Sequence, residues 1–177
     1  VKNFLIPDYN KYENKIDVFI FDVELKKDID IKSKEIKNLK IKAGNNNKIL
    51  KLNINNILKN KKLGNLFLFS NYKQKYSNDP RLVNIICKIK EENLMYERVL
   101  CMYSFVNSKL FSNPVCFIDT DAFIKIDFLD IYNNNFDIAL THTDDLGLMP
   151  INEGVFFVNN RNKINIKSFF KDYIINY

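Results

Sequence analysis

The stretch VCFIDTDAFI, residues 115–124, decides the fold and the chemistry expected of this chain. Its apolar half, residues 115–118, follows a proline and predicts a short strand that is buried on both faces of a sheet. Two carboxylates, Asp119 and Asp121, come directly after that strand. Open parallel sheets bind their ligands at the carboxyl ends of their strands. We therefore expect both carboxylates to lie at the edge of a sheet where ligands bind.

Two neighbouring carboxylates repel each other unless a cation lies between them, and oxygen ligands favour a hard divalent ion. Asp119 and Asp121 are therefore candidate ligands of Mg²⁺ or Mn²⁺, which in such sites also bind oxygens of a substrate phosphate. The alternative is that both are solvated turn residues, because Asp is common in turns. The apolar residues on both sides, 115–118 and 123–124, favour the metal site.

The composition is that of a globular protein with one domain. A chain of 177 residues buries a good core, and a hydrophobic content of 46% with 15 Phe argues against disorder. No apolar run approaches the ~18 residues that span a bilayer, and no secretory signal is visible. Cys87, Cys101 and Cys116 lack metal-binding spacing and predict reduced, buried thiols in a cytoplasmic protein.

The net charge is +6, from 27 basic and 21 acidic residues. Most of the basic residues are lysines that are spread along the chain, whereas nucleic-acid binding favours clustered Arg and Lys with aromatic residues between them. We therefore expect no nucleic-acid partner. The charge is compatible with a mild attraction to phosphate-bearing partners and with peripheral association with an anionic membrane. The oligomeric state is left open.

Apolar runs that alternate with helical patterns predict an α/β fold: a three-layer α/β/α sandwich with a mostly parallel, mixed central sheet. We assign one domain to residues 1–177, of which residues 1–62 are only partly assigned. The expected strands cover residues 16–21, 49–54, 66–69, 115–118, 136–141 and 154–158. The expected helices cover residues 80–89, 91–111, 127–132 and 164–175.

Two of these helices rest on specific signals. Asp79 and Pro80 form a helix-start pattern before an apolar face of Leu82, Ile85, Ile86 and Ile89. The helix over residues 91–111 has an apolar stripe at helical spacing, which predicts packing against the core: Met95, Val99, Met102, Val106 and Leu110. Arg98 lies one residue off that stripe. We interpret it either as a salt-bridge residue at the boundary of the core or as a group that reaches toward a phosphate.

The order of these features resembles the nucleotide-sugar-dependent glycosyltransferases of GT-A fold. The resemblance rests on the helix with Arg98, the strand with its D-x-D motif, the strand FDIALT (136–141) and the segment INEGVFFVNN (151–160), and it covers residues 64–177. It implies a GT-A-like enzyme that moves a sugar from a nucleotide-diphosphate sugar, with a UDP-sugar favoured, to a hydroxyl group of a saccharide, lipid or protein.

The resemblance also implies roles for the motif residues. Asp121 would be the principal metal ligand, and Asp119 would contact the ribose or complete the metal shell. Asn152 and Gly154 match the family's Asn-x-Gly segment, which lines the donor-sugar and acceptor pocket. Glu153 stands between them, where the family often has a small residue.

Two further roles follow from the same resemblance. Arg98 matches a basic helix residue that often faces the donor site. An inverting enzyme needs a carboxylate base for the acceptor hydroxyl, and the candidates are Asp144, Asp145 and Glu153, with Glu153 or Asp145 preferred. The alternative for Asp144 and Asp145 is that they are loop charges in water.

The chain departs from the family pattern in two ways. Many relatives have a metal-binding His after the last helix, whereas the only histidine here is His142, which we interpret as a packing or loop residue at the end of a strand. The chain is also short for the fold, so we expect the usual C-terminal acceptor region to be absent or supplied by a missing segment or a partner.

Two other functions are alternatives. One is a catalytically inactive remnant of such a domain that binds a nucleotide or a partner without turnover. The other is a haloacid-dehalogenase-like phosphatase, which also places D-x-D after a strand and uses one Asp as nucleophile. Against the phosphatase, the chain after residue 119 is too short for the rest of that sheet and its catalytic Lys.

Overall fold

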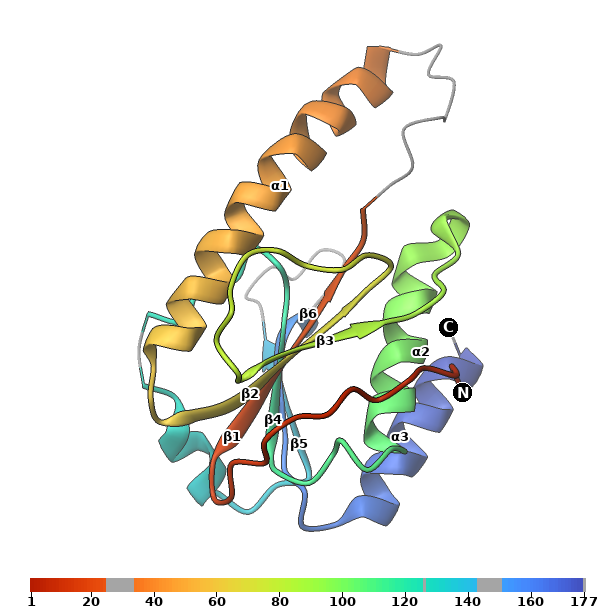
Figure 1. Cartoon of the computed structure of the whole chain (residues 1–177). Coiled ribbons are helices and arrows are strands. Elements are labelled where there is room, and N and C mark those ends of the chain that lie inside the picture. The colour runs from red at the N-terminus through yellow and green to blue at the C-terminus, as the bar shows by residue number, and fades with distance from the viewer. Residues whose placement is uncertain (25–33, 126, 143–150, 177) are drawn as a thin grey trace.

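A computed structural model describes residues 1–24, 34–125, 127–142 and 151–176, with the backbone alone for residues 34–46, 152 and 153 (Figure 1). Within these ranges six strands form one sheet in the order β3-β2-β1-β4-β6-β5. Strands β1 to β4 are parallel, and β6 runs antiparallel to both β4 and β5. The strands are β1 (Ile16–Asp22), β2 (Leu63–Ser70), β3 (Leu82–Ile86), β4 (Val115–Ile118), β5 (Ile138–His142) and β6 (Ile151–Val158).

Helices cover both faces of this sheet. Helix α1 (Lys34–Lys59) crosses one face together with the short 3-10 helix η2 (Leu129–Asn133), and α2 (Leu94–Val106) and α3 (Lys163–Asn176) lie side by side on the other (Figure 1). A second 3-10 turn, η1 (Glu91–Asn93), leads into α2. The architecture confirms the predicted three-layer α/β/α sandwich with a mixed sheet. No helix in the described ranges is long and apolar enough to cross a membrane.

Alternate residues of each central strand enter two different cores, as the period of two in a strand requires. Phe19 of β1 and Phe117 of β4 face α2 and α3, where Phe105 of α2 packs against both rings. Their neighbours Val18 and Cys116 face α1 in a second, mainly aliphatic core. The central strands β1 and β4 are therefore buried on both faces of the sheet, as predicted.

Helix α1 replaces the strand that we expected over residues 49–54. Leu50, Ile54, Ile57 and Leu58 are spaced four, three and one residues apart and lie together against the sheet, almost fully buried. That spacing is helical, and it outweighs the strand preference of the isoleucines in this Asn- and Lys-rich segment. Of the polar residues between them, Lys51 is exposed and Asn55 and Asn56 are half-buried, whereas Asn53 is fully buried.

Strand β3 replaces the helix that we expected over residues 80–89. Val83 and Ile85 point into the core, whereas Ile86 is half exposed at the edge of the sheet, and every residue of β3 is in register with β2. Pairing with β2 satisfies backbone groups that a helix would satisfy internally, and the β-branched run suits a strand. The apolar spacing alone did not distinguish the two.

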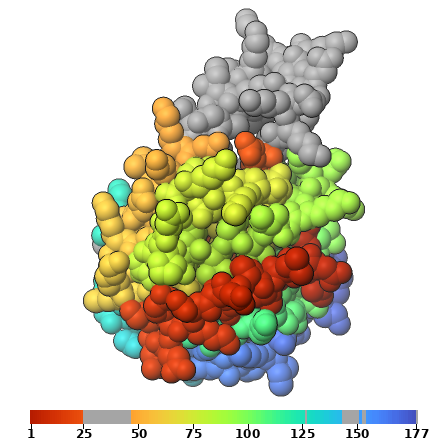
Figure 2. Space-filling view, in the orientation of Figure 1, coloured from red at the N-terminus to blue at the C-terminus, as the bar shows by residue number. Residues whose placement is uncertain are grey.

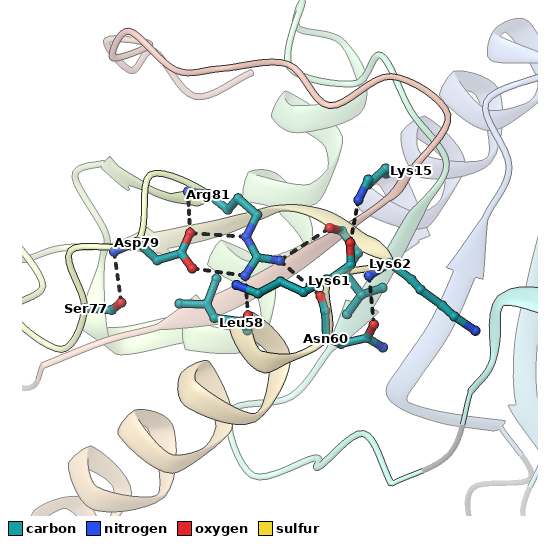
Figure 3. A network of polar contacts seen from close by, with 9 residues as sticks. Lys15, Leu58, Asn60, Lys61, Lys62, Ser77, Asp79 and Arg81 are labelled. Atoms are coloured by element: carbon teal, nitrogen blue, oxygen red, sulfur yellow. Dashed lines mark hydrogen bonds and ion pairs between the residues drawn. The ribbon is translucent and has the colours of Figure 1, made fainter.

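Arg81 explains why Asp79 does not start a helix. Its guanidinium is nearly buried and donates to the carbonyl oxygens of Leu58, of Asn60 at 3.0 Å and of Leu63 at 3.5 Å (Figure 3). The Asp79 carboxylate accepts from Arg81 Nε and Nη2 at 3.2 and 3.0 Å. Arg81 therefore caps the C-terminal end of α1 and ties it to the turn before β3.

The N-terminal segment, residues 1–14, covers the face of β2 that the helices leave open. It lies across the surface as an extended band (Figure 2). Phe4 packs edge-on against Phe69 with ring centroids 5.2 Å apart, and Tyr9 packs in the same way against Phe67 at 5.6 Å. This segment belongs to the same core as α2 and α3.

Candidate functional site

The D-x-D motif lies at the carboxyl end of β4, in the middle of the sheet. Strand β1 runs beside it in parallel, with Ile20 opposite Ile118. The side chain of Asp119 is 40% exposed and that of Asp121 is exposed. The predicted position of the two carboxylates at the carboxyl end of a buried parallel strand is therefore confirmed, and ligand binding there stays a prediction.

Arg98 of α2 forms an ion pair with Asp119. The distance from Arg98 Nη2 to Asp119 Oδ1 is 2.8 Å, and the Arg98 side chain is only 8% exposed. Of the two roles considered for Arg98, the structure shows the salt bridge. The guanidinium balances one of the two motif carboxylates, so it reduces the repulsion between them.

Helix α1 holds the motif from the other side through two asparagines. The buried amide of Asn53 donates from Nδ2 to the carbonyl oxygens of Asp119 at 3.3 Å and Thr120 at 3.1 Å. One helical turn further on, Asn56 Oδ1 accepts from the backbone N–H of Ile124 at 3.1 Å. Sequence reasoning missed both residues because it placed no helix here, although the spacing of Leu50 and its partners carried the signal.

Gly154 of β6 contacts the motif through its backbone. The N–H of Asp119 donates to the Gly154 carbonyl oxygen at 2.8 Å, one step beyond the pairing of Ile118 with Val155. The backbone of residues 152 and 153 continues β6 away from this point, and Asn152 is opposite Thr141 in β5. The structure thus brings Arg98, Asp119 and Gly154 together, and their roles in a donor site stay predictions.

Several candidates lie outside the part of the chain that the structure describes. Asp144 and Asp145 fall within residues 143–150, and the side chains of Asn152 and Glu153 are not described. Their roles remain predictions. His142 ends β5 opposite Ile151, which confirms its expected place at the end of a strand.

The ends of β1 and β2 add polar groups to the same edge. The Tyr72 hydroxyl donates to Asp22 Oδ2 at 2.6 Å, and burial raises the pKa of the Asp22 carboxyl. Beside them, the side-chain amide of Asn71 exchanges two hydrogen bonds with the backbone of Glu24, at 2.9 and 2.8 Å. No motif marks these residues; their position directly after buried strands is the only sequence signal.

The donor set at D-x-D can accept a divalent metal that shares its coordination shell with a phosphate. The described residues contain no group of three His, Cys, Asp or Glu side chains that could hold an ion. The motif offers two carboxylates, one of them already paired with Arg98. Mg²⁺ and similar hard ions commonly take one or two carboxylates and complete their shell with water and substrate phosphate.

The chain matches no protein-family model and no curated protein. Solved glycosyltransferases share its fold. The glycosyltransferase GlyE of Streptococcus pneumoniae TIGR4 is 15% identical, with a TM-score of 0.55 over 90% of this chain and 38% of GlyE. The apo form of GlyE is also 15% identical, with a TM-score of 0.52 over 92% of this chain and 39% of that protein.

A glycosyltransferase involved in glycosylation of the major capsid of PBCV-1 is 12% identical, with a TM-score of 0.50 over 90% of this chain and 65% of that protein. The chain therefore spans between 38% and 65% of the length of these structures. At such low identity the likeness concerns the fold, which is consistent with a GT-A-like arrangement.

Proposed function

We propose that this chain is a glycosyltransferase domain that uses a nucleotide-diphosphate sugar and a divalent metal at Asp119-Thr120-Asp121. The observation that carries the proposal is the position of this motif. It lies at the carboxyl end of a central strand, in a fold shared with solved glycosyltransferases, next to the buried cation Arg98 and the Gly154 backbone.

The two motif aspartates have different surroundings, which supports different roles. Asp121 is exposed and would be the principal ligand of Mn²⁺ or Mg²⁺. Asp119 shares its Oδ1 with Arg98, so it would complete the metal shell or contact the ribose. When bound, the divalent ion supplies positive charge that stabilises the departing diphosphate.

Arg98 would act beside that site as a fixed positive charge. Its guanidinium is buried and held by Asp119, so it orients the carboxylate without the entropy cost of ordering an exposed side chain. Asn152 and Gly154 would line the sugar and acceptor pocket. In an inverting reaction Glu153 or Asp145, with Asp144 as a further candidate, would accept the proton of the acceptor hydroxyl.

The inactive remnant is the alternative that the same measurements address. In that case the site binds a nucleotide without transferring a sugar, so binding and transfer are measured separately. The phosphatase gains no support from the site, because Asp119 is engaged by Arg98 rather than set apart as a nucleophile.

The test is calorimetric titration with UDP, with and without Mn²⁺. We expect binding that depends on the metal and is lost in Asp121→Ala. Asp127→Ala is the matched control. This exposed Asp on the same loop forms an ion pair with the exposed Lys62 and accepts a hydrogen bond from the Leu129 backbone N–H at 3.1 Å, and neither partner belongs to the motif. Its removal should leave binding intact.

Turnover is measured separately, as UDP release from a panel of UDP-sugars with added acceptors. Release that depends on the metal and on Asp121 supports the transferase. Binding without release supports the remnant. No binding of UDP, GDP or CDP in the presence of Mn²⁺ contradicts the proposal.

A further inference from the structure

Two cysteines face each other at the carboxyl end of β3. The distance between Cys87 Sγ and Cys101 Sγ is 3.8 Å, with Cys87 directly after β3 and Cys101 in the middle of α2. The backbone N–H of Cys87 donates to the Ser70 carbonyl oxygen at 2.9 Å, so the sheet fixes its position. The sulfurs are in van der Waals contact, and a disulfide, with a bond of about 2.05 Å, requires them to move closer.

The third cysteine provides an internal comparison. Cys116 is equally buried, but it lies on the opposite face of the sheet, in the core beneath α1. Burial raises the pKa of its thiol above the ordinary value. Cys87 and Cys101 belong to the core on the side of α2, so the sheet separates them from Cys116.

A cavity gives small molecules access to one member of the pair. Its volume is about 530 Å³, and it lies between the N-terminal segment and the ends of β2 and β3. Asn3, Phe4 and Leu5 form one wall, whereas Asn71, Ile86 and Cys87 form the other. Cys101 is not part of this lining and is fully buried, so Cys87 is the sulfur that a reagent would meet first.

The surroundings of Cys87 favour its thiolate. A hydrogen bond from Cys101 lowers the pKa of the Cys87 thiol, and the positive charge of Lys2 acts in the same direction, against burial and the charge of Glu97. Lys2 is held near this point by an ion pair with Glu97 and a hydrogen bond to the Lys88 carbonyl oxygen. Cys87 is only 5% exposed, so reagents reach it through the cavity, where a nearby cation favours the reactive thiolate.

We propose that Cys87 and Cys101 form a peroxide-reactive dithiol that closes to a disulfide within the folded chain. The proposal rests on the distance between the two sulfurs, on the cavity that Cys87 lines and Cys101 does not, and on the contacts that hold Lys2 at Glu97 and at the carbonyl oxygen of residue 88. It does not depend on the proposed glycosyl transfer. The bond would join the end of β3 to α2, one helical turn after Arg98.

The chemistry requires hydrogen peroxide as the oxidant. The Cys87 thiolate attacks one peroxide oxygen, the O–O bond breaks, and hydroxide leaves and takes up the proton that Cys87 had lost. The Cys101 sulfur then attacks the sulfur of the Cys87 sulfenic acid. The S–O bond breaks, and the second water leaves with the Cys101 proton. Two thiols are oxidised by two electrons, and peroxide is reduced to two waters.

The first test is exposure of the native chain to hydrogen peroxide, followed by intact mass and tryptic mapping. We expect the loss of two hydrogens and a disulfide between the peptides that contain Cys87 and Cys101, which trypsin separates at Lys88, Lys90 and Arg98. Cys116→Ser should still form this bond. Cys87→Ser and Cys101→Ser should not form it.

The second test establishes that the bond forms in the folded state. The oxidation rate of the native chain should change by less than about twofold in urea concentrations below the onset of unfolding. A rate that rises in parallel with the unfolded population would overturn the proposal. Addition of two oxygens to Cys87 without a cross-link, or a native chain that keeps all three thiols while the urea-unfolded chain oxidises, would overturn it as well.

Discussion

The two edges of the sheet place their aspartates in opposite surroundings. At the carboxyl edge Asp119 is 40% exposed and its charge is balanced by Arg98. At the amino edge Asp17 is 1% exposed, and its oxygens accept from the Asn65 N–H at 2.7 Å and from Asn113 Nδ2 at 3.2 Å. Both partners of Asp17 are neutral. Asp17 therefore joins segments inside the core, whereas Asp119 pairs with a buried cation and stays partly exposed to solvent.

The same contrast holds for two asparagines. Asn53 and Asn65 are both fully buried, and in the described part of the chain the Oδ1 of each lacks a hydrogen-bond partner. Asn53 donates to the backbone of the D-x-D motif, whereas Asn65 donates to the Asn10 carbonyl oxygen at the opposite edge. If only the carboxyl edge binds a ligand, substitutions at either edge should lower the free energy of unfolding, but only those at the carboxyl edge should also weaken binding.

The largest effect is expected at the amino edge, from Arg81→Met. Methionine keeps much of the apolar volume but removes the guanidinium that donates to the carbonyl oxygens at the end of α1 and to Asp79. The Asp79 carboxylate then keeps only the backbone N–H of residue 81, at 2.9 Å. Loss of one partner of such a buried network costs roughly 3–5 kcal/mol. Urea denaturation measures the change in the free energy of unfolding. An unchanged midpoint would show that water replaces the guanidinium without cost.

The next effect concerns the pH dependence of stability. Burial raises the pKa of Asp17 to about 7, from an ordinary value of 3.8. A raised pKa means that the folded state binds the proton more tightly, so this contribution to stability is fully present below the unfolded pKa and is lost as the pH rises through 7. The free energy of unfolding should therefore fall by roughly 2–3 kcal/mol between pH 5 and pH 8.

Asp17→Asn keeps a neutral side chain of the same shape and should flatten that slope. Part of the slope should remain, because the pKa of Asp22 at the carboxyl edge is also raised by burial. Urea midpoints at several pH values measure both chains. A slope equal to that of the wild type would mean that Asp17 is ionised in the folded state throughout this range.

The smallest effect on stability is expected from Asn53→Leu and its matched control Asn65→Leu. Each removes one buried amide, and each should lower the free energy of unfolding by about 1–2 kcal/mol. Only Asn53→Leu should also weaken metal-dependent UDP binding and speed amide hydrogen exchange at residues 119–124, because only Asn53 holds that loop. The exchange measurement remains informative if the chain binds no UDP.

Equal effects of the two substitutions on exchange at residues 119–124 would contradict this role for Asn53. The loss would then reflect general destabilisation, and the contrast between the two edges would be one of exposure alone. Weaker UDP binding in Asn65→Leu, at a temperature where both variants are folded, would have the same meaning.

Local patterns were sufficient where a segment carried a strong signal of its own. The run at residues 115–118 predicted β4 because only a strand between two helical layers buries every residue of so short a segment. The same reasoning predicted β1 and β2, and the four-residue spacing of Val99 and its partners predicted α2. The carboxyl-edge position of Asp119 and Asp121 followed from strand direction.

Local patterns failed where two periods fitted the same residues. The apolar positions of residues 82–89 fit a helix as well as a strand, and pairing with β2 decided for β3. Residues 49–54 contain β-branched residues that suit a strand, yet Leu50 and Ile54 pack against the sheet from α1. In both segments the deciding energy came from partners far away in the sequence.

Residue order and composition thus determined the layers of the fold, the strands at its centre and the place of the acidic motif, since these depend on short-range periodicity and burial. The partners of that motif depended on tertiary structure. Asn53 lies 66 residues before Asp119, and Arg98 reaches it from another helix. Hydrogen bonds and ion pairs of this kind depend on distance in space, which spacing along the chain does not encode.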